Sequence, residues 1–195
     1  MPQATAPGGP YFAQSIRLLA EETYVRAFPG GTGDAKTAGN YGGGLLAAKL
    51  AQAQGYHNVM WLDGKDRKIA EESGVMNIMF VINGVAVTPN LSGTILPGVT
   101  RDSVLTLLRE MNIPHQERAI TVDEVFAASA SGTLQEAFGI GTAAVIAPIA
   151  AIGYRDKEAR IETGKSDGIA KQLHSKLVAI QTGKEPDTHE WLLYV

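Results

Sequence analysis

The chain has 195 residues, of which 45% are hydrophobic and 19% charged, and its formal net charge is -3. This length suits one sizeable domain, and this balance excludes a disordered chain and a basic surface for nucleic acid. The absence of cysteine excludes disulfides and thiolate sites, and the four histidines lack metal-ligand spacing, so no metal is predicted.

The first part of the chain is predicted to run from a tail through a strand and a glycine-rich turn into a helix. Residues 1–10 are rich in Pro and Gly, as is typical of a flexible tail, and they show no secretory signal pattern. Alternation over residues 23–28 predicts a strand, and the apolar stripe of residues 41–54, which Gly55 ends, predicts a helix. No apolar run reaches the length of a membrane span, so we expect a cytoplasmic protein that makes no membrane contact.

The rest of the chain mixes hairpins with single helices. Asn83-Gly84 predicts a hairpin between strands at 77–82 and 85–88. Thr100 is predicted to cap a helix at 101–111, and Thr121, with Glu124 three residues on, to cap another. The other predicted elements are strands at 58–62, 68–71, 116–119, 135–138 and 143–149, and a closing helix at 168–181 ended by Gly183. This order favours an α+β or mixed α/β fold.

A glycine-rich segment, residues 30–44, places one lysine, Lys36, among small residues. Glycine at that density weakens regular structure and permits a close approach of the backbone to a ligand. A lysine that attacks an aldehyde must be neutral part of the time, and its neighbours must be small if a planar ring is to lie beside it. We expect Lys36 to meet both requirements, with burial lowering its pKa, although a solvated loop lysine is the commoner case.

The same segment also resembles a phosphate-binding loop. Residues 30–37 nearly match the pattern GxxxxGK[ST], and Asp63 ends an apolar run as a magnesium-binding aspartate does. Ala35 replaces the glycine before the lysine, and Asp34 places a negative charge where phosphates bind. A nucleotide-binding protein is therefore the second hypothesis.

Several motifs in one order resemble the branched-chain amino-acid aminotransferases, which are fold-type IV pyridoxal-phosphate enzymes. The first is GGTGDAKTAGNY at residues 30–41. The others are WLDG at 61–64, ESGVMN at 72–77, ILPGVTR at 95–101, FGIGTA at 138–143, IQTG at 180–183 and HEW at 189–191. The resemblance covers about Tyr11 to Val195.

The resemblance implies a fold and a division into parts. Residues 15–195 are expected to form the pyridoxal-phosphate-binding large domain, a sheet-rich pseudo-barrel flanked by helices. Residues 1–14 are expected to be a flexible tail and a loop of the kind that joins the two domains of the family. The small N-terminal domain of the family, which supplies an arginine to the cofactor phosphate and apolar walls to the substrate pocket, matches nothing here. The chain is therefore either a fragment or a form without that domain.

The resemblance also implies how the cofactor, pyridoxal phosphate, is bound. Lys36 matches the lysine that carries the cofactor as a Schiff base and later acts as acid and base. Tyr41 matches the tyrosine that hydrogen-bonds the phenolic oxygen of the cofactor. Glu72 matches the acid that pairs with the pyridine nitrogen, although without the resemblance a surface glutamate would be the simpler interpretation. The remaining cofactor positions are Leu96 on the ring face and Val99, Thr100 and Thr142 at the phosphate.

Substrate contacts are implied at Tyr11, Val75, Thr142 and Ala143. The family usually has threonine where this chain has Val75, so one hydroxyl near the substrate carboxylate is lost. A pair of cysteines found in some animal members is replaced within residues 144–147, so a thiol redox switch is not expected.

The function implied is transfer of the amino group of Leu, Ile or Val to 2-oxoglutarate. The expected partners are small amino acids and 2-oxo acids, and a second copy of the chain in a homodimer. A related activity on D-amino acids or aminodeoxychorismate is the near alternative. A truncated domain with little or no activity is another, because the phosphate arginine and half of the pocket have no match.

Overall fold

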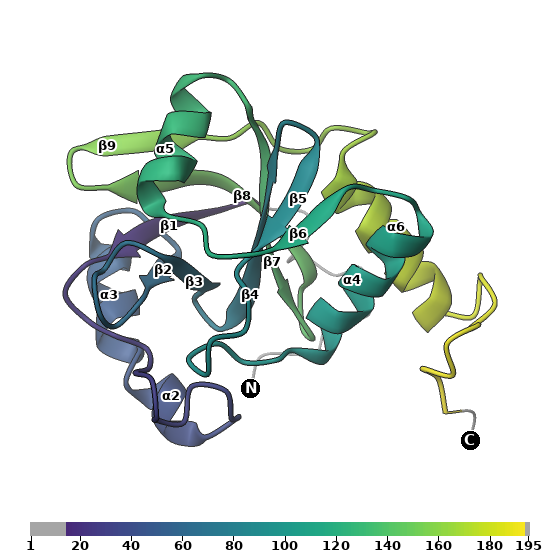
Figure 1. The fold of residues 1–195 in the computed structure, drawn as a ribbon, viewed down its shortest axis with the longest axis horizontal. Coiled ribbons are helices and arrows are strands. Elements are labelled where there is room, and N and C mark those ends of the chain that lie inside the picture. Colours follow the sequence, from purple (N-terminus) through teal and green to yellow (C-terminus); the bar gives the residue numbers. More distant parts are fainter. Residues whose placement is uncertain (1–14, 194–195) are drawn as a thin grey trace.

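The computed structural model describes residues 15–193 and contains nine strands and five helices in that range (Figure 1). The strands are β1 (Ile16–Glu21), β2 (Asn58–Leu62), β3 (Ala70–Ser73), β4 (Met76–Ile82), β5 (Val85–Thr88), β6 (His115–Glu117), β7 (Leu134–Gly141), β8 (Val145–Tyr154) and β9 (Lys157–Arg160). The helices are α2 (Ala38–Gly42), α3 (Leu45–Ala53), α4 (Val99–Glu110), α5 (Val122–Ala130) and α6 (Ile169–Gln181).

The strands form one mixed sheet that closes on itself. The order is β3-β2-β1-β8-β7-β4-β5-β6, with β9 paired to β8, and an additional pairing joins β3 to β4. That pairing makes a ring of β3, β2, β1, β8, β7 and β4. Closure removes the free edges of these strands, and β5, β6 and β9 extend from the ring. The fold class is therefore the mixed barrel-like sheet with flanking helices that the resemblance implied.

The core is divided by the wall of this barrel. Alternate residues of the strands, such as Leu18, Met60 and Phe80, form one buried cluster, and α5 adds Val122 and Val125 to it. The intervening residues of β4 and β7 pack against α4 and α6, and those of β2 pack against α3. Figure 1 shows α4 and α6 together on one side and α3 on the other. The first cluster therefore fills the barrel, and three helices cover its outside.

Several local predictions are confirmed. The bounds of β2 and β5 are those predicted, and the Asn83-Gly84 turn has positive φ at both residues, 51° and 75°. Such φ values suit a tight hairpin whose twist matches its strands. The hydroxyl of Thr121 accepts a hydrogen bond from the backbone N–H of Glu124, as the capping pattern predicted.

The prediction of a strand at residues 23–28 is wrong. The strand that the sheet uses is β1, which ends at Glu21 and pairs in parallel with β2 and β8. The carboxylate of Glu21 accepts hydrogen bonds from the N–H groups of Thr23 and Tyr24, and these bonds turn the chain away from the sheet. Residues 23–28 then lead to the lysine segment as an irregular stretch.

The single helix predicted at 41–54 is divided into α2 and α3. Gly43 and Gly44 lie at the break, where each glycine weakens a helix by about 1 kcal/mol relative to alanine. A side chain at Gly44 would lie 3.0 Å from the ring of Trp61 on β2, so a larger residue there would have to displace that ring slightly.

Other differences concern the ends of elements. The N-cap of α4 is Gly98 and not Thr100, because Val99 and Thr100 already have helical geometry. The strand predicted at 68–71 is shifted to β3, where it pairs with both β2 and β4. The short strand β9 was not predicted. The strand predicted at 135–138 is longer at both ends as β7, whereas the one predicted at 143–149 begins later, at Val145, and continues to Tyr154 as β8.

Candidate active site

The lysine segment holds Lys36 beside Tyr41. The Nζ atom of Lys36 lies 3.2 Å from the hydroxyl of Tyr41, which is on α2. The amide of Asn40 donates to the carbonyls of Thr32 and Ala35 and so fixes the curve of the loop. The expectation that Lys36 is buried is wrong, because the residue is exposed in a loop at the surface. Its neighbours along the chain are small, so its amine is accessible to a flat ligand.

Glu72 supplies a buried carboxyl group on β3. The residue is 2% exposed, its Oε1 accepts the backbone N–H of Leu96 at 2.8 Å, and its Oε2 lies 2.8 Å from Nε of Arg26. Burial raises the pKa of Glu72 to about 7, although Arg26 and the N–H of Leu96 act in the opposite direction. Near neutral pH this carboxyl group can therefore both hold and release a proton.

Arg26 is a functional candidate that the sequence did not reveal. Its side chain is 2% exposed, and besides the ion pair it donates from Nη1 to the carbonyls of Gly33 and Thr94. It therefore ties the lysine loop to Glu72. The only signal in the sequence was weak, an arginine among apolar and small residues just before the glycines, and nothing there indicated Glu72 as the partner.

Asn77 connects Glu72 to the start of α4. It lies opposite Glu72 in the β3–β4 pair and opposite Ile140 in the β4–β7 pair. Its amide donates to the carbonyl of Leu96, and a side chain at Gly98 would lie 2.3 Å from its Oδ1. The chain from 96 to 98 is thus held against the barrel wall, and α4 begins there with Val99 83% exposed and Thr100 half-buried.

The turn between β7 and β8 carries Thr142 and Ala143, which are both exposed. It ends at Val145, whose φ of 56° is in the left-handed region. A branched side chain in that region costs on the order of 1–3 kcal/mol, so the shape of this turn is imposed by its surroundings. A side chain at Gly141 would lie 3.0 Å from Met76, so this turn adjoins the β3–β4 turn, where Val75 is 61% exposed.

The structure therefore brings most of the predicted site residues to one end of the barrel. Lys36 is close enough to Glu72 for its charge to act on the carboxyl group, and Leu96 is hydrogen-bonded to it. Around that end, Val75, Thr142 and Ala143 lie on turns between strands, and Val99 and Thr100 lie in the first turn of α4. Tyr11 lies outside the described residues.

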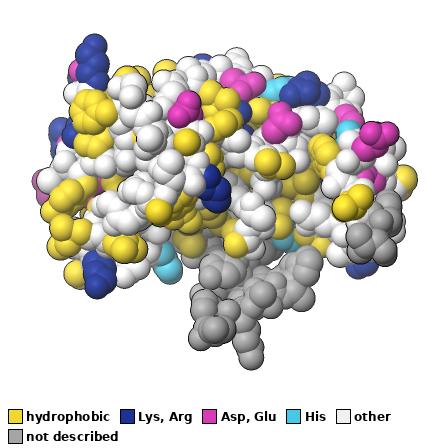
Figure 2. All heavy atoms as spheres, turned by 90° about the horizontal axis from the view of Figure 1, so that it is seen from below, with side chains coloured by type: hydrophobic (Ala, Val, Ile, Leu, Met, Phe, Trp, Pro, Cys, Tyr) yellow, Lys and Arg dark blue, Asp and Glu magenta, His cyan; other side chains and the backbone are white. Residues whose placement is uncertain are grey.

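Apolar side chains are exposed on the same side of the molecule. Figure 2 shows hydrophobic side chains spread over the lower face, which carries α2. The exposed large apolar residues of the described chain include Phe28, Leu45, Leu46, Val75 and Val99.

The geometry does not support a phosphate-binding loop. That loop needs a strand before it, and the structure has none at residues 23–28. The carboxylate of Asp63, which would have to bind magnesium, accepts hydrogen bonds from four backbone N–H groups, those of residues 65, 66, 68 and 69. Those bonds use the lone pairs that a metal would need.

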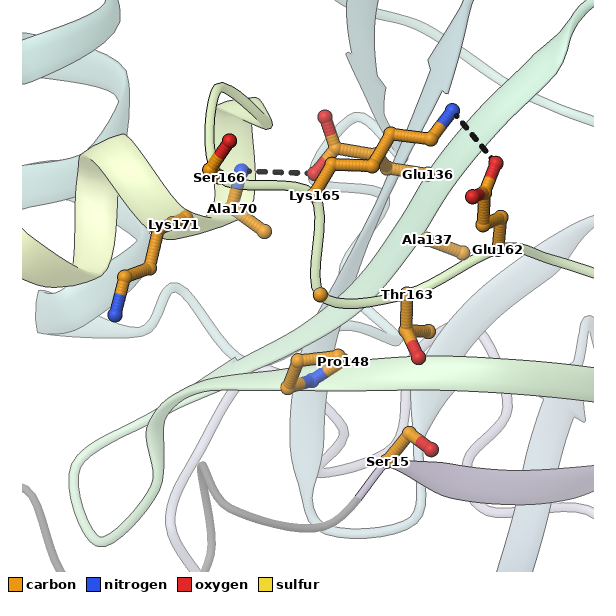
Figure 3. Close-up of a pocket in the computed structure, with 11 residues that line it drawn as sticks. Ser15, Glu136, Ala137, Pro148, Glu162, Thr163, Lys165, Ser166, Ala170 and Lys171 are labelled. Carbon is orange, nitrogen blue, oxygen red and sulfur yellow. Dashed lines mark hydrogen bonds and ion pairs between the residues drawn. The ribbon is translucent and has the colours of Figure 1, made fainter.

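A cavity of about 250 Å³ lies elsewhere, beside the start of α6 (Figure 3). The carboxylate of Glu136 accepts the N–H groups of Ile169 and Ala170, and Lys165 pairs with Glu162. The main polar groups of this cavity are therefore paired with one another. The lining of the cavity contains none of the residues that the motifs singled out.

The fold and this group of residues define the chain as an aminotransferase of class IV. The model of the family described as amino-transferase class IV matches residues 4–152, so the chain belongs to that family. Among curated relatives, branched-chain-amino-acid aminotransferase 2 of Bacillus subtilis (strain 168) is 45% identical over 95% of this chain and 52% of its own length. The resemblance stated from the motifs is thereby confirmed.

Solved structures agree with this assignment. The branched-chain aminotransferase of Thermoproteus uzoniensis, crystallised with norvaline, has a TM-score of 0.80 at 30% identity, and the match covers 95% of this chain and 58% of that one. The branched-chain amino acid aminotransferase of Escherichia coli has a TM-score of 0.78 at 27% identity over 93% of this chain and 57% of its own. A third such enzyme, complexed with N-(5'-phosphopyridoxyl)-L-glutamate, has a TM-score of 0.78 at 28% identity over 92% of this chain and 56% of its own.

The chain thus spans about half the length of the relatives it matches. Within residues 15–193 the structure contains no helix long and apolar enough to cross a membrane.

Proposed function

We propose that residues 15–195 are the pyridoxal-phosphate-binding large domain of a branched-chain amino-acid transaminase. The observation that carries this proposal is the connection of three groups: Lys36 with Tyr41 on one loop, and the buried Glu72 joined to that loop through Arg26. An accessible amine, a phenol and a buried carboxyl group with a pKa near neutrality are the groups that a pyridine aldehyde would use.

The described residues fit the proposed cofactor. Lys36 would bind its aldehyde carbon, Tyr41 its phenolic oxygen and Glu72 its ring nitrogen. Leu96 would pack on the ring, and the phosphate would meet the N–H groups at Val99 and Thr100 and the turn at Thr142, because the first N–H groups of a helix have no partner within the helix. When bound, the cofactor would supply an electron sink that makes the proton at the substrate Cα easier to remove.

The protein groups have separate tasks in the proposed reaction. Lys36 moves the proton from the substrate Cα. Tyr41, whose hydroxyl accepts a hydrogen bond from the lysine Nζ at 3.2 Å, would donate its own hydrogen to the phenolic oxygen of the cofactor. Glu72 would hold the proton of the ring nitrogen, and Arg26 with the N–H of Leu96 fixes the orientation of that carboxyl group.

We propose Leu, Ile and Val as amino donors and 2-oxoglutarate as the acceptor. The names of the relatives support the donors, and the phosphopyridoxyl-glutamate in one of the solved relatives supports an acceptor related to glutamate. Tyr11, Val75, Thr142 and Ala143 stay predicted as substrate contacts. The cytoplasmic location, the homodimer and the small-molecule partners also stay predictions.

Activity of this chain alone is expected to be far below that of its full-length relatives. The chain spans about half of their length, and the side chains around the site, such as Val75 and Val99, are exposed. An open pocket admits water and positions a substrate poorly, and misplacement by about 1 Å reduces rates on the order of a hundredfold.

The test is amino transfer from leucine to 2-oxoglutarate, measured with the chain alone and with the small domain of a relative added in trans. We expect slow transfer that the added domain increases and that Lys36→Ala abolishes. Lys49→Ala, at an exposed position of α3, is the matched control and should keep the rate of the unchanged chain. No transfer with the added domain, or equal rates for Lys36→Ala and Lys49→Ala, would refute the proposal.

A further inference from the structure

Glu71 occupies an irregular place in β3, next to Glu72. Trp61 lies opposite Glu72 and Leu62 lies opposite Ala70, so Glu71 is left without a partner in β2. Such a bulge interrupts the regular alternation of side chains along a strand, and bulges are common next to active sites, where they re-aim a side chain. Both glutamates are buried, at 4% and 2% exposure. Glu71 is thus a buried acid beside the candidate site to which the proposed reaction gives no task.

Thr94 links Glu71 to the arginine that holds Glu72. The hydroxyl of Thr94 donates a hydrogen bond to Oε1 of Glu71, and its carbonyl accepts one from Nη1 of Arg26. The Nε atom of Arg26 is paired with Glu72. Within residues 15–193, Nη2 of Arg26 and Oε2 of Glu71 are buried without a hydrogen-bond partner. Two buried carboxyl groups are therefore connected to one guanidinium, the first through Thr94 and the second directly.

The charge of Glu71 acts on Glu72 in the opposite direction to that of Arg26. Burial raises the pKa of Glu72 to about 7. Arg26, the backbone N–H of Leu96 and the charge of Lys36 lower this pKa, whereas the charge of Glu71 raises it. Like charges in one buried site disfavour the ionised form of each group. Without Glu71, Glu72 would therefore be left to the cations and would bind a proton less readily.

The charge of Glu71 itself depends on Thr94. Burial raises the pKa of Glu71, and the hydrogen bond from the hydroxyl of Thr94 lowers it. Of the charged groups around it, Asp63 also raises this pKa, and Arg26 and Arg67 lower it. A hydrogen bond donated to a carboxylate favours its ionised form. The hydroxyl of Thr94 therefore helps to keep on Glu71 the charge that opposes Arg26.

We propose that Glu71 is a positioning residue of the candidate active site. Its carboxylate, held by Thr94, offsets the charge of Arg26, so that Arg26 can orient Glu72 and still leave it able to hold a proton. The task of that proton, at the ring nitrogen of the cofactor, rests on the proposed function, whereas the effect of Glu71 on Glu72 needs no cofactor. Glu71 acts through Arg26 and its charge, so it needs no contact with cofactor or substrate.

The test is a pH titration of the chain without cofactor, followed by carbon NMR of the side-chain carboxyl groups. The signal of Glu72 is the one absent from Glu72→Gln. In Glu71→Gln the pKa of Glu72 should fall by about one unit, as expected when a like charge leaves a shared site. Glu162→Gln, at an exposed carboxylate beside the other cavity, should leave the pKa of Glu72 unchanged. The amide of Leu96, which is bonded to Glu72, should stay protected from hydrogen exchange in all these variants except Glu72→Gln.

A second pair of variants leaves both glutamates in place. Thr94→Val removes the hydroxyl and should also lower the pKa of Glu72, by less than Glu71→Gln does, whereas Thr94→Ser keeps the hydroxyl and should match the unchanged chain. This pair tests the proposal even if Glu71→Gln does not fold.

Three outcomes would each overturn the proposal. They are an unchanged or raised pKa of Glu72 in Glu71→Gln, equal values in Thr94→Val and Thr94→Ser, and loss of the protection of Leu96 in Glu71→Gln, which would show that Glu71 only maintains the structure. A failure of Lys36 to bind pyridoxal phosphate would refute the proposed function and would not alter this titration, because the titration contains no cofactor.

Discussion

Replacing Arg26 by methionine is expected to destabilise the chain strongly, because it leaves Glu72 without its charged partner. Both side chains of this pair are nearly inaccessible, at 2% and 3% exposure. Removing one partner of a buried ion pair typically costs about 3–5 kcal/mol. The substitution also removes the donor of the hydrogen bonds to the carbonyls of Gly33 and Thr94, so the lysine loop loses its tie to β3.

The loss should depend on pH because Glu72 can relieve it by binding a proton. In the unchanged chain Glu72 has a pKa of about 7, and without Arg26 this pKa should rise further. From about pH 6 to about pH 8 the native state of the unchanged chain releases that proton, whereas the variant keeps it. The destabilisation should therefore be about 1.4 kcal/mol larger at the higher pH, since one pKa unit corresponds to about that free energy.

Urea unfolding followed by circular dichroism at both pH values measures the effect. Arg17→Met is the matched control, because Arg17 pairs with Glu158 at 41% exposure and such pairs contribute less than about 1 kcal/mol. If Arg26→Met loses no more stability than Arg17→Met, or loses the same at both pH values, then Arg26 does not hold a charged Glu72 as described.

Two further predictions concern stability. Gly98→Ala should destabilise the chain by about 1–3 kcal/mol, as overpacking does, because the added Cβ would lie 2.3 Å from Oδ1 of Asn77. Gly42→Ala is the control and should not destabilise the chain, because the space around Gly42 is open. Equal losses of stability for the two variants in thermal unfolding would contradict this prediction. Burial raises the pKa of Glu72 to about 7, above its value in the unfolded chain, so the stability that Glu72 contributes is present at low pH and is lost as the pH rises toward about 7. Glu72→Gln should therefore flatten the fall in the free energy of unfolding between about pH 5 and about pH 7. Urea unfolding that gives the same pH dependence for the variant and the unchanged chain would refute this prediction.

The parts of the fold that the sequence predicts are those governed by neighbours along the chain. The Asn83-Gly84 hairpin and the Thr121 cap depend on a few adjacent residues, and both are found as expected. Strand β1 was missed because its place depends on parallel pairing with β2 and β8, which lie far away in sequence. A barrel-like sheet followed only from the resemblance to the family, and its closure by the pairing of β3 with β4 was not predicted.

In the candidate site, too, contacts between residues close in sequence could be predicted, whereas contacts between distant segments could not. Lys36 and Tyr41 are five residues apart, and their contact lies within one loop that the motif marks. The burial of Glu72 was not visible in its sequence, since a glutamate beside another glutamate is typical of a surface turn. Its partner Arg26 and the connecting Asn77 come from other elements, so only the closed barrel brings them together.

The central claim is that Lys36 is the residue that binds pyridoxal phosphate covalently. The most direct measurement is borohydride reduction of the chain mixed with the cofactor, followed by peptide mass mapping. We expect a stable phosphopyridoxyl adduct on Lys36, absent from Lys36→Ala and retained in Lys49→Ala, which changes an exposed lysine of α3. An adduct spread evenly over surface lysines, or one that persists unchanged in Lys36→Ala, would contradict the claim.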